Sequence, residues 1–124
     1  MGNVRPVFDT NILIDYLNGY PQAAQELARY PAAAISPITW IEVMAGAVSD
    51  GEEKSLRAFL GRFNQIPLDR QVAEAALVLR RQHRIRLPDA IIWGTARSEG
   101  TLLITRNTRD FPEQEPDVRV PYRL

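Results

Sequence analysis

Residues 5–17 of the chain read RPVFDTNILIDYL, and this stretch decides the fold. Its apolar start predicts a short buried strand, and the following NILIDYLN predicts an amphipathic helix that ends near Gly19 and Pro21. Asp9 stands between these two elements. A carboxylate at such a junction caps the helix, receives a phosphate or holds a metal ion. Each interpretation requires different residues elsewhere in the chain.

The alternation of short apolar segments and helices continues along the chain. Further strands are predicted at 32–36, 65–68 and 101–105, and helices at 21–30, 37–48, 52–63, 70–84 and 88–100. Ser36 and Asp69 stand where two of these helices need an N-cap. Strands of four or five residues that alternate with helices predict an α/β fold, with a parallel sheet covered on both faces. The proline-rich tail at 111–124 is compatible with a final strand or with packing on a partner.

Composition limits the class of protein. The 124 residues are enough for one domain, and the net charge of zero argues against wrapping nucleic acid by bulk electrostatics. The absence of cysteine removes disulfides and thiolate zinc sites, which suits a reducing cytoplasm. The N-terminus has no signal-peptide core, and no apolar run approaches the roughly 20 residues of a membrane span. We therefore expect a cytoplasmic protein without membrane contact.

Acidic side chains are the candidates for a functional site. In parallel sheets, sites form beyond the carboxyl ends of the strands, where Asp9 and the segment TRNTRD at 105–110 both lie. Glu42 and Asp89 are further candidates, since Glu42 is mid-helical beside the apolar Ile38 and Ile41, and a buried charge there needs a partner. Taken singly, each acid also has a purely structural interpretation as a cap or turn residue.

A cluster of these acids predicts a particular chemistry. Two carboxylates about 4 Å apart repel by roughly 4 kcal/mol at an effective dielectric constant of 20, so a cluster requires a counter-ion. Magnesium and manganese prefer such oxygen ligands, and they promote displacement at phosphorus. The sequence therefore predicts a metal-dependent hydrolase of phosphate esters, provided that the acids meet in space.

Other chemistries that use an aspartate after the first strand do not fit. A haloacid-dehalogenase-type phosphatase needs a second aspartate where this chain has Asn11, and a receiver domain needs a lysine after its last strand, whereas Lys54 is the only lysine. A dinucleotide site needs a glycine-rich turn, which DTN does not provide. His83, the only histidine, lies in an arginine-rich helix end and is expected to be a surface residue.

Four segments together resemble the motifs of PIN-domain ribonucleases of the VapC toxin type. They are VFDTNILIDYL (7–17), SPITWIEVMAGA (36–47), LPDAIIWGTARSEG (87–100) and LLITRNTRDF (102–111). Each motif is weak alone, but the four occur in the right order in a chain of suitable length. The resemblance implies one PIN-like domain over residues 1–124, a three-layer α/β/α sandwich around a short, mainly parallel sheet.

The resemblance also implies roles for individual residues. Asp9, Glu42 and Asp89 match the acidic metal-binding positions of the family. The fourth acid of many relatives is replaced by Asn107, and Asp110 is expected to supply the missing carboxylate as a fourth catalytic residue. Supporting contacts to the metal's waters or the phosphate are expected from Thr10 and Thr105, and Asn107 can offer a carbonyl oxygen to the metal or its water. Contacts to the RNA backbone are expected from Arg84, Arg86, Arg106 and Arg109. Asp15 matches a position that is often acidic but lies well into the first helix.

The implied activity is that of a Mg²⁺- or Mn²⁺-dependent endoribonuclease, the toxin of a toxin–antitoxin pair. Such an enzyme hydrolyses RNA, for example a transfer RNA, to 5′-phosphate and 3′-hydroxyl ends. The resemblance further implies a homodimer, an antitoxin that covers the active site, and contact with DNA only through that antitoxin. The alternative is a catalytically weak PIN-fold binding module, because Asn107 brings no charge. A flap nuclease needs additional helices, for which this chain has no spare residues.

Overall fold

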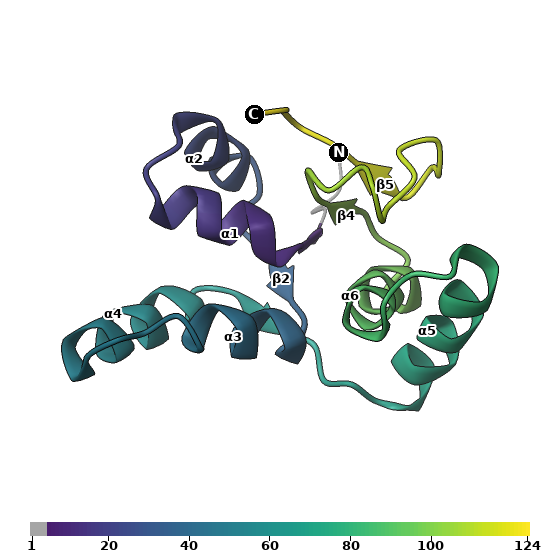
Figure 1. Ribbon diagram of the computed structural model, residues 1–124, viewed down its shortest axis with the longest axis horizontal. Coiled ribbons are helices and arrows are strands. Elements are labelled where there is room, and N and C mark those ends of the chain that lie inside the picture. Colours follow the sequence, from purple (N-terminus) through teal and green to yellow (C-terminus); the bar gives the residue numbers. More distant parts are fainter. Residues whose placement is uncertain (1–4) are drawn as a thin grey trace.

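Five short parallel strands form the central sheet of the computed structural model, which describes residues 5–124 (Figure 1). Their order is β3-β2-β1-β4-β5. The strands are β1 (Val7–Phe8), β2 (Ala34–Ile35), β3 (Asn64–Gln65), β4 (Leu103–Ile104) and β5 (Val118–Arg119). All four pairings are parallel, as the sequence predicted. Residues 1–4 lie outside the described part of the chain. The start of the expected 1–124 domain and the start of the segment expected to lack a signal peptide therefore lie there too.

Helices cover both faces of this sheet, which confirms the predicted three-layer sandwich. They are α1 (Thr10–Leu17), α2 (Pro21–Ala28), α3 (Pro37–Met44), α4 (Asp50–Leu60), α5 (Arg70–His83) and α6 (Leu87–Ser98). Figure 1 shows α5 and α6 on one side of the strands and the first four helices on the other. None of the helices within residues 5–124 is long and apolar enough to cross a membrane.

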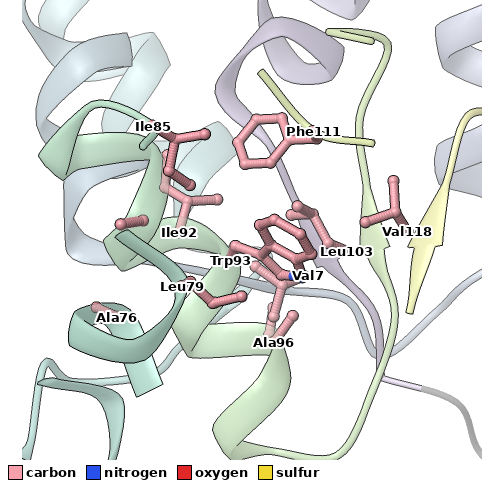
Figure 2. Close-up of a cluster of buried hydrophobic side chains, with 12 residues drawn as sticks. Val7, Ala76, Leu79, Ile85, Ile92, Trp93, Ala96, Leu103, Phe111 and Val118 are labelled. Carbon is pink, nitrogen blue, oxygen red and sulfur yellow. The ribbon is translucent and has the colours of Figure 1, made fainter. Parts of the chain in front are cut away.

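The core has two parts because side chains alternate along each strand. Val7 and Leu103 point toward α5 and α6, whereas Phe8 and Ile104 point toward α1, α3 and α4. Trp93 of α6 lies fully buried in the first part, among side chains from α5, the strands and the loop after β4 (Figure 2). Apolar strands that are buried on both faces explain why β1, β2 and β4 are uniformly apolar.

Several predicted boundaries are confirmed. Ser36 and Asp69 cap α3 and α5, accepting hydrogen bonds from the amides of Ile38 and Val72. Gly100, just beyond α6, has φ = +63°, a conformation that glycine adopts without steric cost. The strand predicted at 65–68 was placed too late, because β3 is Asn64–Gln65 and Pro67 has no amide hydrogen to donate to a strand. The tail does form a final strand, β5.

Candidate active site

Three helices carry the acidic side chains to one end of the sheet. Asp9 lies between β1 and α1 and caps α1, Glu42 lies in α3, and Asp89 lies in the first turn of α6. Helix α3 contacts both α1 and α6, so it brings its side chains between the other two helices. The carboxyl ends of parallel strands are therefore the place where these acids approach one another.

Asp9 is a buried carboxylate with two hydrogen-bond donors. Its side chain is 5% exposed, its Oδ1 accepts from the backbone amide of Thr10 at 2.8 Å, and its Oδ2 accepts from the Thr105 hydroxyl at 2.7 Å. Burial nevertheless raises the pKa of Asp9 to about 6, and the neighbouring charges of Asp89 and Glu42 act in the same direction. The donors fix the orientation of the carboxylate without neutralising it.

Asp89 has a similar environment but one cationic neighbour. It is 7% exposed, and burial raises its pKa despite the opposing effect of Arg86, whose Nε lies 3.3 Å from Asp89 Oδ2. The carboxylates of Asp110 and Glu42 raise the pKa further. Asp89 therefore interacts with the charges of both the α3 acid and the loop acid.

The argument that Glu42 is a buried charge was wrong. Glu42 is exposed, as is Ile41 beside it at 57%, and the buried side chains of α3 are those of Thr39 and Val43. Of the two apolar neighbours of Glu42, Ile38 packs against the core and Ile41 does not, so Glu42 shares the exposed face of α3 with Ile41. Its carboxylate accepts a hydrogen bond of 2.5 Å from the Thr10 hydroxyl, which also lies 3.1 Å from the Thr39 hydroxyl.

The loop after β4 is held by its own polar side chains. Asn107 Nδ2 donates to Asp110 Oδ2 at 2.8 Å, while Asn107 Oδ1 accepts from the Asp110 amide at 3.3 Å. The Thr105 hydroxyl accepts from the Asn107 amide at 3.0 Å while it donates to Asp9. Asn107 therefore orients Asp110, and Thr105 links this loop to Asp9.

The donor set suits a hard divalent cation, although no ready-made cage is present. Within residues 5–124, no three Asp, Glu or His side chains are arranged to hold a metal ion as they stand. Glu42 is turned toward Thr10, and Asp89 toward Arg86. The fit rests instead on chemistry: the four carboxylates offer oxygen ligands, and their mutual repulsion at Asp9 and Asp89 is relieved by a cation. The metal-ligand assignment stays a prediction.

The arginines expected to contact RNA divide into two groups. A polar hollow of about 730 Å³ is lined by Asn11, Arg86, Arg106, Asn107, Arg109 and Asp110. Arg84 does not line this hollow and instead ends α5 with φ = +55°. Arg106 donates to Asp15 through Nε and Nη2, so Arg106 has a structural role that the sequence did not reveal.

The sequence profile of the PIN domain family matches residues 7–115. The chain belongs to the PIN domain family. It is 32% identical over 125 residues to Ribonuclease VapC19 of Mycobacterium tuberculosis (strain CDC 1551 / Oshkosh), covering 94% of this chain and 98% of that protein.

Solved structures agree with the PIN assignment. A toxin–antitoxin complex from Klebsiella pneumoniae contains a chain that is 45% identical, with a TM-score of 0.90, and the match covers 96% of this chain and 99% of that one. DNA-bound VapBC from Salmonella typhimurium, at 24% identity and a TM-score of 0.74, shares the fold over 94% of this chain and 96% of that one.

One buried ion pair of this PIN domain was missed at the sequence level. Asp15 is 1% exposed, pairs with the Arg106 guanidinium at 2.5 and 2.8 Å, and accepts from the Tyr122 hydroxyl at 2.8 Å. Burial alone would raise the pKa of Asp15, but these donors lower it. The available signal was an acid beside Ile12 and Leu13 on the buried face of α1.

The expectation that His83 is a surface residue was also wrong. Its side chain is 21% exposed, and its ring packs on Trp93 with the ring centroids 4.8 Å apart. His83 Nε2 lies 3.4 Å from a carboxylate oxygen of Glu115. In this PIN domain, His83 therefore joins the end of α5 to the core and to the segment before β5.

Proposed function

We propose that this chain is the toxin of a toxin–antitoxin pair, a Mg²⁺- or Mn²⁺-dependent endoribonuclease formed by one PIN-like domain over residues 1–124. The observation that carries the proposal is the buried Asp9, whose pKa is raised to about 6 next to the charges of Asp89 and Glu42. Membership of the PIN family and similarity to a protein named as a ribonuclease support the same activity.

The proposed roles follow from the contacts of each side chain. Asp9 and Asp89 hold the metal ion, and Glu42 binds it directly or through water. Such an ion, when bound, stabilises charge on a phosphodiester in displacement and lowers the pKa of a coordinated water. Thr105 fixes the Asp9 carboxylate, so this acid is oriented before substrate arrives, whereas Thr10 holds the Glu42 carboxylate in the metal-free protein.

Asp110 is proposed to complete the negative charge of the site. Asn107 holds its carboxylate through a 2.8 Å hydrogen bond, and that carboxylate acts on the charge of Asp89. Asn107 thus contributes by positioning Asp110 rather than by bringing a charge. In the reaction, water adds to phosphorus and the bond from phosphorus to the 3′-oxygen breaks, which leaves 5′-phosphate and 3′-hydroxyl ends.

The proposed partners come from the similar structures. One of them is described as a toxin–antitoxin complex, and another as VapBC bound to DNA. We therefore infer a cognate antitoxin that covers the acidic site, contact with DNA only through that antitoxin, a homodimer, and a place of action in the cytoplasm. The RNA substrate, for example a transfer RNA, is named by analogy with the family.

The test is cleavage of RNA by the purified, partner-free protein. We expect cleavage of transfer RNA in millimolar Mg²⁺ or Mn²⁺, its loss with EDTA, and a loss of at least 100-fold in Asp9→Asn and Asp89→Asn, on the order of the effect of removing one electrostatic catalytic group. Arg70→Gln is the matched control, because Arg70 is almost fully exposed and its one partner within residues 5–124 is Glu74 in its own helix. Cleavage that persists in EDTA or in Asp9→Asn contradicts the proposal.

A binding module is the second candidate, and two observations favour it. Asn107 replaces an acid, and no ready-made three-ligand metal group exists within residues 5–124. Titration with Mn²⁺, followed by thermal unfolding, separates the candidates. An increase in Tm that disappears in Asp89→Asn supports the enzyme, whereas no response at millimolar Mn²⁺ supports the module.

A further inference from the structure

Beside the acidic cluster lies a polar hollow that is rich in arginine side chains. It has a volume of about 730 Å³, and Arg86, Arg106 and Arg109 line it together with Asn107 and Asp110. Guanidinium groups favour phosphate because they donate in a planar, bidentate arrangement. The hollow therefore differs in chemistry from the carboxylate cluster that it adjoins.

The three arginines differ in how far they are already paired with carboxylates. Arg106 is engaged by the buried Asp15 through two hydrogen bonds. Arg86 has a side chain that is 75% exposed, with one contact to Asp89 at 3.3 Å. Arg109 is exposed, and no side-chain partner for it is found among residues 5–124. Arg109 thus supplies the hollow with a positive charge that is unpaired within residues 5–124, and Arg86 supplies an exposed guanidinium that also contacts Asp89.

The position of these two arginines connects the hollow to the proposed reaction centre. Arg86 is the N-cap residue of α6, three positions before Asp89. Arg109 directly precedes Asp110, whose charge acts on Asp89. A phosphate held by both arginines would lie next to the phosphodiester that the proposed reaction cleaves. The described residues lining the hollow include no aromatic side chain, so it offers no platform for stacking a base.

We infer that the hollow binds the RNA phosphate adjacent to the scissile one, through Arg86 and Arg109. The inference rests on the proposed endoribonuclease function and adds a backbone subsite to it. A phosphate contact positions RNA without reading its sequence. Any single-stranded RNA is therefore a valid probe, and the natural substrate is not required.

The experiment measures binding of a fluorescent 20-nucleotide poly-uridine by the full-length Asp9→Asn protein, without added metal, across a series of salt concentrations. Each phosphate contact contributes about 0.7 to the slope of log Kd against log salt on a single strand. We expect Arg86→Gln and Arg109→Gln each to lower the slope by about that amount and to weaken binding about threefold to tenfold at low salt. Arg86→Lys is expected to restore most of the slope.

Arg81→Gln is the matched control, because Arg81 is exposed on α5 and does not line the hollow. It is expected to keep the parent slope. If the wild type cleaves RNA with metal but Arg86→Gln and Arg109→Gln keep the parent slope, the subsite is wrong and the nuclease stands. If the wild type neither binds nor cleaves RNA, both proposals fail. An equal loss in Arg81→Gln also overturns the subsite, since general charge then explains binding.

Discussion

At the scale of single residues, Asp9 shows how a functional position opposes folding. Its pKa rises from 3.8 to about 6 on folding, so the folded state keeps a proton that the unfolded state has released. Stability therefore falls as pH rises through that window, and the loss persists above it. A shift of this size corresponds to roughly 2–3 kcal/mol, because one pKa unit is worth about 1.4 kcal/mol.

The first prediction concerns Asp9→Asn in metal-free protein. The substitution removes the charge but keeps the shape, so we expect greater stability at pH 7 by roughly 1–3 kcal/mol and a flatter fall between pH 4 and 6. Thermal unfolding across that pH range measures both effects. Asp89, whose pKa is also raised, likewise lowers the stability of the protein as pH rises. Asp15, whose pKa is lowered, stabilises the protein at neutral pH, and this contribution is lost as pH falls. A variant less stable than the wild type at pH 7 would contradict this account.

The second prediction concerns the buried ion pair of Asp15. Replacing Arg106 by Gln leaves Asp15 buried with the Tyr122 hydroxyl as its remaining donor, so we expect destabilisation by about 3–5 kcal/mol. Urea unfolding measures it. The control, Arg70→Gln, breaks an exposed pair on α5 and is expected to change stability by less than about 1 kcal/mol. Similar effects of the two substitutions would show that burial does not decide the strength of the pair.

At the scale of elements, the contact between α5 and α6 depends on one glycine. A Cβ atom at Gly94 would lie 2.8 Å from the Ala76 backbone nitrogen and 3.1 Å from the Val72 carbonyl oxygen. These are backbone atoms of α5, so they move only if the helix moves. Helix α6 carries Asp89 in its first turn, and the close approach therefore fixes the helix that presents this acid.

The third prediction compares two glycine-to-alanine substitutions. Gly94→Ala forces the helices apart and is expected to destabilise the protein by about 1–3 kcal/mol, the usual cost of overpacking. Gly51→Ala places a Cβ near the start of α4 with only the Ser49 hydroxyl at 3.9 Å, so we expect a gain of about 0.5–1 kcal/mol. Chemical denaturation of both variants provides the measurement. The prediction fails if the two substitutions change stability in the same direction.

The fourth prediction concerns the end of α5. Arg84 adopts a left-handed conformation with φ = +55°, which costs an L-residue roughly 1–2 kcal/mol, and its side chain is exposed. Arg84→Gly is therefore expected to raise stability by about 0.5–1 kcal/mol, and Arg84→Val to lower it by at least as much. Thermal unfolding of the two variants provides the measurement. Both variants lose the same surface charge, so a gain in stability for Arg84→Gly together with a loss for Arg84→Val would come from the backbone conformation.

At the scale of the whole molecule, the two parts of the core share the same strands. Each strand has two residues, and in β1 Val7 belongs to one part of the core and Phe8 to the other. Strands this short gain little from pairing alone, so the sheet depends on helices packed on both faces. The acidic site lies where α1, α3 and α6 meet and inherits this dependence.

The fifth prediction follows from that shared sheet. Leu79→Ala in one part of the core and Leu60→Ala in the other are each expected to lower stability by about 2–5 kcal/mol and to shift a single unfolding transition. The exposed Leu77→Ala is the control, with an effect under about 1 kcal/mol. Calorimetry and near-ultraviolet circular dichroism report the number of transitions. Two separate transitions in either core variant would show that the parts fold independently.

The sequence by itself determined the architecture of the fold and several local features of its strands and helices. Uniformly apolar short segments predicted buried parallel strands, and Ser36 and Asp69 predicted helix starts, because burial and capping are written in neighbouring residues. The position of Asp9 at the end of the first strand followed from the same pattern. The motifs, taken together, also predicted the PIN family that the comparisons confirm.

Only the tertiary structure decided which distant side chains meet. It exposed Glu42, joined Asp15 to Arg106 and Tyr122, buried much of His83, and separated Arg84 from the arginines of the hollow. It also placed a short strand, β5, within the tail after Phe111. The physical reason is that periodicity reports whether a residue is buried, whereas its partner depends on how separate helices pack on the sheet.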